Sequence, residues 1–219
     1  MAERMKLNRL GRLGLNSPTR AFVQRHVVAP LLERLGGRVE AGRALELGCG
    51  RGVGGEIILD RFGPAHLELI DIDPEMVEGA LRRLAGRAGA VVRVGDGTRI
   101  EASDGSFDAV FDFGAIHQMP DWPAAVAEVR RVLKPGGRLF FEEVASPALR
   151  WTLRFTVEGW PSPHSRLFSR EAFLTELEAD GLSVGPRLAD RRLLYVATVL
   201  SAGLVGDLVG VAERRAASE

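Results

Sequence analysis

The sequence predicts an α/β domain built on a doubly wound parallel sheet. From residue 43 onward, short apolar runs alternate with helical segments, and this alternation is typical of a parallel sheet covered by helices on both faces. A length of 219 residues suits one domain with an added cap, and 46% apolar residues is ample for a packed core. Ligands of such sheets bind beyond the carboxyl ends of the strands, so we expect function in the loops that follow them.

The predicted strands and helices follow one another in regular order. Short apolar runs predict the central strands, at 43–47, 67–71, 91–94, 107–112 and 138–142. Longer amphipathic segments predict helices at 54–61, 74–85, 123–133 and 169–180. Two further strand-like runs, 182–188 and 193–200, are expected to pair as an antiparallel hairpin.

Residues 1–40 predict an N-terminal helical segment. Its first helix begins near Ser17, and Pro30 marks a kink or a junction between two helices. Two roles remain open for it: packing on the main domain, or forming a lid or a wall of the functional site.

The main domain is expected over residues 41–200, followed by a C-terminal tail over 201–219. The apolar stretch 193–212 contains Asp207 and three glycines, which favours a buried strand plus helix over a membrane span. The apolar part of the tail, 201–212, is a candidate interface helix of a homodimer.

Composition excludes several classes of protein. Lys plus Arg equal Asp plus Glu at 29 each, so the chain lacks the basic surplus of a nucleic-acid-binding protein. A single cysteine, Cys49, excludes an internal disulfide, and four scattered histidines form no short metal motif, so no metal is expected. The N-terminus shows no export signal, which together with the lone cysteine predicts a cytoplasmic protein.

The first predicted strand runs into a glycine-rich turn, Gly48-Cys49-Gly50-Arg51-Gly52, ahead of a helix. Glycines at this spacing let the backbone turn sharply and approach a ligand closely. The overlapping run from Gly50 to Gly55 also matches the dinucleotide fingerprint G-x-G-x-x-G, so the turn alone does not identify the ligand.

Carboxylates follow the next two strands. Asp71 ends the second strand, 19 residues after Gly52, where a carboxylate accepts hydrogen bonds from the two hydroxyls of a ribose. Asp96 follows the third strand and is placed to accept from an exocyclic amine such as that of adenine. Both residues also have a plain interpretation as turn formers, and we expect Asp73 to cap the helix that begins at Pro74.

Taken together, these segments resemble the class I S-adenosylmethionine-dependent methyltransferases. The resemblance extends from about residue 43 to 200 and rests on five segments: 45–52, 70–76, 95–97, 104–108 and 133–137. It implies a Rossmann-like sheet of seven strands with an antiparallel last strand. It also implies S-adenosyl-L-methionine as cofactor and S-adenosyl-L-homocysteine as product.

The resemblance assigns a role to each residue around the cofactor. It implies that Glu46 lies near the methionine ammonium and that Asp71 holds the ribose. Ile72 is then expected to flank the adenine, with Asp96 facing its amino group. The full set implied for cofactor binding is Glu46, Gly48, Cys49, Gly50, Asp71, Ile72, Gly95, Asp96, Gly97 and Phe113.

The methyl side of the cofactor is expected beside residues 113–117, after the fourth strand. His117 is the candidate general base, because its ordinary pKa near 6.5 permits proton uptake at neutral pH; the alternative is a structural role. Glu142 and Glu143, at the end of the fifth strand, are candidates to bind or deprotonate an acceptor. Strand alternation predicts that one of these two points to solvent.

Residues 146–168 are an insertion rich in ring-bearing side chains. It forms either an acceptor pocket or ordinary packing against the N-terminal helix, and as a pocket it favours an apolar or aromatic acceptor. The candidate substrate residues are Trp151, Phe155, Trp160, His164 and Phe168.

Rival functions lack their residues. A short-chain dehydrogenase needs Tyr-x-x-x-Lys, whereas Val199 stands four residues after the sole tyrosine, Tyr195. The Asp/Asn-Pro-Pro-aromatic motif of amino-methylating nucleic-acid enzymes is absent after Asp112. The sequence thus favours a methyltransferase acting on a small molecule by in-line displacement, and leaves open a non-catalytic protein that binds the same cofactor.

Overall fold

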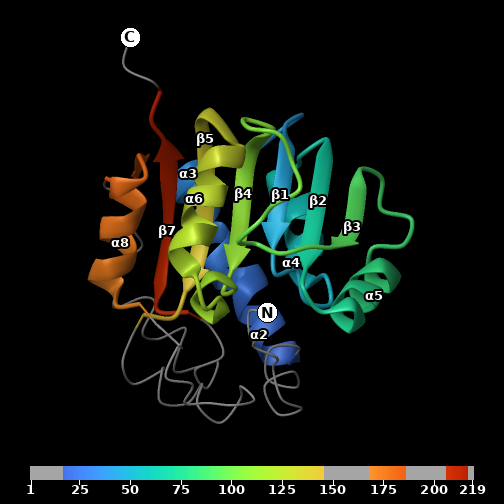
Figure 1. Ribbon diagram of the computed structural model, residues 1–219. Helices are drawn as coiled ribbons and strands as arrows, with labels where there is room; N and C mark the ends of the chain where they lie inside the picture. The colour runs from blue at the N-terminus through green and yellow to red at the C-terminus, as the bar shows by residue number, and fades with distance from the viewer. Residues whose placement is uncertain (1–16, 146–167, 186–205, 217–219) are drawn as a thin grey trace.

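A computed structural model describes residues 17–145, 168–185 and 206–216, which form a seven-stranded sheet between helices (Figure 1). The strand order is β3-β2-β1-β4-β5-β7-β6. The pairs among β1 to β5 are parallel, and β7 runs antiparallel to both of its neighbours. This confirms the predicted Rossmann-like sheet with its antiparallel last strand. The strands are β1 (Arg43–Leu47), β2 (His66–Asp71), β3 (Ala90–Val94), β4 (Phe107–Phe113), β5 (Leu133–Glu143), β6 (Leu182–Ser183) and β7 (Leu208–Arg214).

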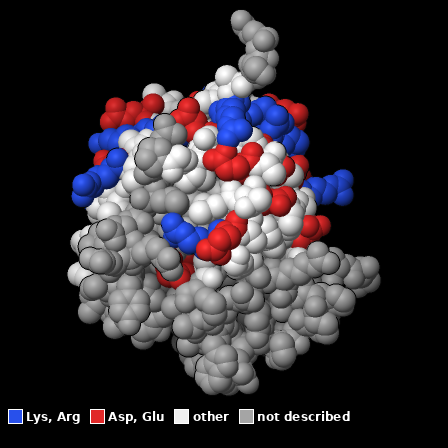
Figure 2. All heavy atoms as spheres, turned by 90° about the vertical axis from the view of Figure 1, so that its left-hand side faces the viewer, with Lys and Arg blue, Asp and Glu red and all other residues white. Residues whose placement is uncertain are grey.

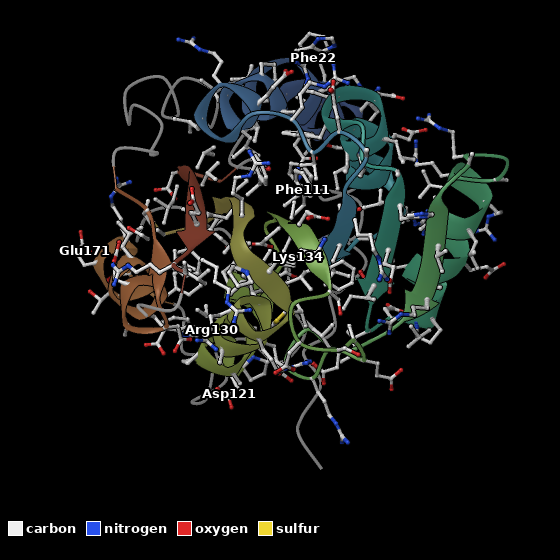
Figure 3. All side chains as sticks on the ribbon, turned by 90° about the horizontal axis from the view of Figure 1, so that it is seen from above. Phe22, Phe111, Asp121, Arg130, Lys134 and Glu171 are labelled. Atoms are coloured by element: carbon white, nitrogen blue, oxygen red, sulfur yellow. The ribbon has the colours of Figure 1, made fainter. Side chains whose placement is uncertain are left out.

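Helices cover both faces of the sheet, as Figure 3 shows in a view along the strands. On β5, Phe140 packs in the cluster with helix α3, whereas its neighbour Phe141 packs in the opposite cluster with α6 and α8. At the centre, Phe111 stacks on Phe140 with ring centroids 4.6 Å apart. The helices are α2 (Pro18–Val23), α3 (Ala29–Gly36), α4 (Val53–Ile57), α5 (Pro74–Arg83), α6 (Trp122–Val132) and α8 (Arg170–Ala179).

The N-terminal helices α2 and α3 are joined through a π-helical turn, η1 (Gln24–Val28). Ser17 caps α2 by accepting a hydrogen bond from the Arg20 N–H. The Ala29 N–H reaches back to the Gln24 carbonyl, five residues earlier, just before Pro30. Proline has no N–H to continue an α-helical ladder, so the local widening at the predicted kink has a direct cause.

The last two strands differ from their predicted positions. β6 is only Leu182–Ser183, and its partner β7 lies at Leu208–Arg214, whereas the expected strand at 193–200 falls outside the described residues. The interpretation of 201–212 as an interface helix is wrong for its described end, because residues 208–212 are a buried strand beside β5. A strand covered on both faces reads as an unbroken apolar run, which periodicity alone cannot separate from a buried helix.

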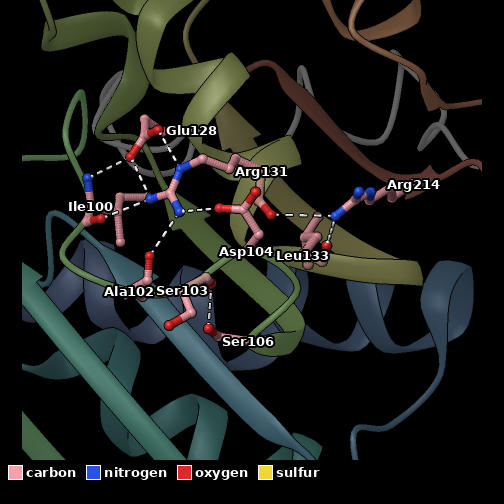
Figure 4. Close-up of polar contacts among 9 residues, drawn as sticks. All are labelled: Ile100, Ala102, Ser103, Asp104, Ser106, Glu128, Arg131, Leu133 and Arg214. Atoms are coloured by element: carbon pink, nitrogen blue, oxygen red, sulfur yellow. Dashed lines mark hydrogen bonds and ion pairs between the residues drawn. The ribbon is translucent and has the colours of Figure 1, made fainter.

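A polar hub around Arg131 ties the segment between β3 and β4 to helix α6 (Figure 4). The Arg131 guanidinium donates to the carbonyls of Ile100 and Ala102 and to the carboxylates of Asp104 and Glu128. These bonds hold the pKa of Glu128 below its ordinary value. The hub lies at the amino end of β5, on the opposite edge from the predicted cofactor loops, so its role is structural.

The strand register brings the predicted site residues to one edge of the sheet. Leu47 pairs with both Ile70 and Asp112, and Phe113 pairs with Glu142, so the carboxyl ends of β1, β2, β4 and β5 are level. In Figure 1 this is the lower edge of the sheet, and α2 lies beside it. Strand order reverses between β1 and β4, which is where α/β sheets bind their ligands. In the described ranges, no helix has the length and apolar character needed to cross a membrane.

Candidate functional site

The glycine turn after β1 has left-handed backbone at three positions. Gly48, Gly50 and Gly52 have φ of 59°, 52° and 82°. A side chain at Gly48 would overlap the Cβ of Ala115, whereas a Cβ at Gly50 would meet nothing within 4 Å. Gly48 is therefore needed for packing against the segment after β4, and Gly50 faces open space. The thiol of Cys49, between them, is 4% exposed, and burial raises its pKa.

Asp71 fastens this turn. One oxygen, Oδ2, accepts the Gly50 N–H at 2.9 Å, and Oδ1 accepts the Asp73 N–H at 2.9 Å. Burial raises the pKa of Asp71, against the opposing effect of these two bonds. Each carboxylate oxygen has two lone pairs, so both keep capacity for a further donor such as a ribose hydroxyl. As predicted, Asp73 caps α5 by accepting the Glu75 N–H.

Glu46 is a buried carboxyl group with an unsatisfied oxygen. Its side chain lies on β1 under Gly54, where any larger residue would overlap the Oε1 atom. The residue is 2% exposed, and within the described part of the chain its Oε2 has no hydrogen-bond partner. Burial raises its pKa well above the ordinary value, and nearby Asp71 raises it further, while Arg20 acts in the opposite direction. A buried polar atom without a partner is costly, so this position favours a ligand that donates a hydrogen bond to it.

The residues predicted at the adenine end are more exposed. Asp96 is exposed, and its Oδ1 accepts the N–H and the hydroxyl of Thr98, at 2.8 and 2.7 Å. Its other oxygen retains acceptor capacity. Ile72, 39% exposed, presents an apolar surface between Asp71 and α5, as expected for a flank of an aromatic base.

Gly95 and Gly97 lie in the same loop and pack closely. A Cβ at Gly95 would come within 3.1 Å of Ile70, and one at Gly97 within 2.5 Å of the Met119 methyl group. Met119 was missed by the sequence analysis, because a single methionine 22 residues further along carries no signal of this contact.

At the carboxyl ends of β4 and β5, His117 lies in a buried acidic environment. Its Nδ1 is 2.5 Å from Glu143 Oε2, and its backbone N–H donates to Glu143 Oε1 at 3.2 Å. Burial lowers the pKa of His117 to about 4 and raises that of Glu143 to about 7. At neutral pH the imidazole is therefore uncharged.

Glu142 and Glu143 point to opposite faces of β5, yet both are buried, at 1% and 0% exposure. The prediction that one of them faces solvent is wrong, because each face is covered there. Glu142 Oε2 accepts from Gln24 of η1 at 2.8 Å, and its Oε1 accepts the Gly206 N–H at 2.8 Å. Protein donors thus engage both oxygens of Glu142.

Arg20 is a site residue that the sequence analysis missed. It projects from α2, is 9% exposed, and donates to the Phe113 carbonyl at 2.8 Å and to Gln24 Oε1 at 3.2 Å. Phe113 itself, 7% exposed, is packed beside Phe111. A Cβ at Gly114 would lie 3.5 Å from both Arg20 Nη2 and His117 Cε1, so these three residues meet at the end of β4.

Phe168 is a core residue rather than part of an acceptor pocket. It is 2% exposed and stacks on Phe173 with ring centroids 4.5 Å apart, while Trp122 lies edge-on at 4.9 Å. These contacts explain its aromatic character through packing between α6 and α8. The other four candidate substrate residues lie outside the described residues: Trp151, Phe155, Trp160 and His164.

Comparison with known proteins identifies the family of this site. Residues 45–141, which contain the glycine turn, Asp71, Asp96 and His117, match a family described as a methyltransferase domain. The chain contains a class I methyltransferase domain. Its family implies S-adenosylmethionine as cofactor, and the unsatisfied Glu46 oxygen and the open space at Gly50 fit the ammonium and the adenosyl group of that molecule.

Characterised methyltransferases share this region. A fatty-acid O-methyltransferase from Mycolicibacterium smegmatis is 33% identical over 105 residues, which cover 48% of this chain and 38% of that relative. A 2-methyl-6-phytyl-1,4-hydroquinone methyltransferase from Synechocystis is 31% identical over 150 residues, covering 64% of this chain and 46% of the relative. The chain thus spans less than half the length of these curated relatives.

Solved methyltransferases share the fold over nearly the whole chain. A methyltransferase from Aquifex aeolicus superposes with a TM-score of 0.67 at 20% identity, over 95% of this chain and 98% of that one. At this identity, the likeness concerns the fold alone.

Proposed function

We propose that this methyltransferase transfers a methyl group from S-adenosylmethionine to a small-molecule acceptor. The observation that carries the proposal is the buried Glu46 carboxyl, whose Oε2 has no partner among the described residues. Glu46 precedes Gly50 by four residues in the sequence, and at Gly50 the glycine loop faces open space. An amino-acid ammonium is a ligand that satisfies such an oxygen while the adenosyl part occupies the open side.

The remaining cofactor contacts follow from the same edge of the sheet. Asp71 offers its spare lone pairs to the ribose hydroxyls, and its bond to the Gly50 N–H keeps the turn in place for them. Ile72 packs against the adenine, and the Asp96 oxygen that is not bonded to Thr98 accepts a hydrogen bond from the adenine amino group. When bound, S-adenosylmethionine supplies an electrophilic methyl group on a sulfonium. The protein's contribution is to align the acceptor with that group, exclude water and, for a protic acceptor, remove a proton.

An apolar small molecule is the acceptor class that we favour. Relatives that share the methyltransferase region carry names that specify a fatty acid and a hydroquinone as acceptors. The chain has no net charge, and Figure 2 shows acidic and basic side chains interspersed over the α8 side of the molecule rather than gathered by sign. Nucleic-acid phosphates favour a basic surface, which this face does not offer.

A methyl-transfer screen tests the proposal. The full chain is incubated with S-adenosylmethionine carrying a labelled methyl group, together with fatty acids, hydroxylated lipids and quinols, and in parallel with RNA, DNA and protein. We expect label in the organic extract of the first set. Label in nucleic acid or protein instead would overturn the acceptor class. Calorimetric binding of the cofactor without transfer to any acceptor would favour the non-catalytic alternative.

A further inference from the structure

A chain of buried acidic groups behind His117 is not used by the function described so far. Asp112, on β4, is 0% exposed, and its Oδ1 accepts the N–H groups of Ala115 and Ile116. Within the described residues no donor reaches its Oδ2. Glu143 lies on the neighbouring strand, two residues beyond Phe141, which is the register partner of Asp112. Two buried carboxyl groups this close favour a proton on one of them, because like charges oppose each other in a buried site.

The proton is expected on Asp112. Burial, and then the adjacent Glu143, raise the pKa of Asp112 well above its ordinary value. Glu143 instead accepts from backbone donors: the His117 N–H at 3.2 Å and the Val144 N–H at 3.3 Å. These donors favour the charged form of Glu143, although burial holds its pKa at about 7.

The geometry of His117 relative to Glu143 determines which ring nitrogen carries the proton. With Nδ1 2.5 Å from Glu143 Oε2, a neutral imidazole that pairs with the charged form of Glu143 must place its proton on Nδ1. Nε2 is then the nitrogen with the free lone pair. The ring carbon next to it, Cε1, lies toward Gly114, where the missing side chain leaves space between His117 and Arg20.

We propose that Glu143, backed by Asp112, is a positioning residue that holds His117 in the Nδ1–H form, with Nε2 free to accept a proton from the acceptor. The inference rests on the proposed function for the identity of that acceptor. In the step, the acceptor's O–H or N–H bond breaks and the proton moves to Nε2. The heteroatom keeps the electron pair and bonds to the methyl carbon, while the methyl–sulfur bond of the donor breaks and leaves its electron pair on sulfur. Glu143 then stabilises the imidazolium until it releases a proton to water.

The groups that face His117 from the elements packed against it determine how readily its ring takes up a proton. Burial is the main reason why the pKa of His117 is low, and Arg20 from α2 lowers it further. Glu142 from β5 and Asp207 before β7 act in the opposite direction, and Asp112 on β4 does so only in its charged form. The ordinary state of His117 is therefore neutral, and the charge that arises during proton transfer lies among carboxyl groups rather than in an apolar pocket.

Nitrogen NMR of the full chain tests the tautomer without cofactor or activity. The protein is labelled with ¹⁵N-histidine, and the four histidines are assigned by comparison with His117→Asn. At neutral and mildly alkaline pH, where Glu143 is charged, we expect Nδ1 of His117 at a protonated shift and Nε2 at an unprotonated shift. A protonated Nε2, or an imidazolium at neutral pH, would overturn the inference. This measurement needs no variant of Glu143, so it stands even if such a variant fails to fold.

Kinetics then separate positioning from packing. With an acceptor from the screen, Glu143→Gln should lower kcat by at least about tenfold with little change in KM, and calorimetry should show that the variant still binds the cofactor. Glu143→Asp should recover part of the lost kcat. Equal kcat in wild type and Glu143→Gln would overturn the proposal. If the cofactor does not bind the wild-type chain, the proposed function is wrong. The NMR spectrum still decides separately which ring nitrogen of His117 carries the proton.

Discussion

Replacing Glu46 by glutamine should stabilise the free protein and weaken cofactor binding at the same time. The substitution keeps the shape of the side chain under Gly54 but removes the charge that burial opposes. The two effects have opposite signs because Oε2 of the wild-type carboxyl has no hydrogen-bond partner in the free protein and gains one only when a cation is bound.

The stability effect depends on pH with a defined sign. The folded-state pKa of Glu46 is raised, whereas an unfolded glutamate ionises near 4.3. Between these values the folded state binds more protons, so the free energy of unfolding falls as pH rises. At pH 7 an unsatisfied buried group costs about 1–3 kcal/mol, and each kcal/mol corresponds to roughly 2–4 °C in Tm for a chain of this size. Glu46→Gln should recover part of this cost at pH 7 and little of it at pH 4.

The binding effect is of similar size. A hydrogen bond to a charged group contributes about 1.5–3 kcal/mol, so the Kd for S-adenosylmethionine should rise by roughly one to two orders of magnitude. A cationic ammonium also lowers the pKa of Glu46, so wild-type binding should release protons at neutral pH. Titration calorimetry in buffers with different ionisation enthalpies measures that release, and it should be smaller in Glu46→Gln.

The matched control is Glu101→Gln, which makes the same chemical change at a side chain that is 85% exposed. It should alter neither Tm, Kd nor proton release. If Glu46→Gln behaves like this control, the carboxyl does not receive the ammonium, and the assignment that supports the proposed function is lost.

Three further substitutions test other parts of the structure. Asp71→Ala should weaken cofactor binding, measured by calorimetry, at least tenfold, which is about 1.4 kcal/mol. Asp73→Ala should remove only the cap of α5, so the free energy of unfolding should fall by about 1 kcal/mol while the calorimetric Kd stays the same. Gly48→Ala should lower the free energy of unfolding, measured by denaturant titration, by about 1–3 kcal/mol more than Gly86→Ala does. Both glycines have a positive φ, but only a side chain at residue 48 would meet Ala115. Equal losses in the two variants would argue against that packing. Phe168→Leu should lower the free energy of unfolding by about 1–3 kcal/mol without changing the KM for an acceptor. A raised KM together with unchanged stability would indicate that Phe168 belongs to the acceptor site.

The cofactor side of the site could be predicted from sequence because each of its signals is local. A strand, a glycine turn and a helix start occupy the ten or so residues around Gly50, and the chemistry needs backbone that only glycine adopts easily. Asp71 and Asp96 follow strands in the same way. Parallel pairing then brings these loops together without further information, since the carboxyl ends of the strands share an edge.

The methyl side could not be predicted in the same way, because its contacts join distant parts of the chain. Arg20 meets Phe113 across 93 residues, and Gln24 meets Glu142 across 118. Nothing in the amphipathic pattern of the N-terminal helix indicates which strand end it covers, and strand alternation identifies opposite faces of β5 but not what lies on them. The burial of Glu142 follows from that covering, and Arg20 of the same N-terminal segment adds to the effect of burial in lowering the pKa of His117. The environment of His117, the proposed general base, is therefore defined by how the chain packs around it, and only the histidine itself is visible in the sequence.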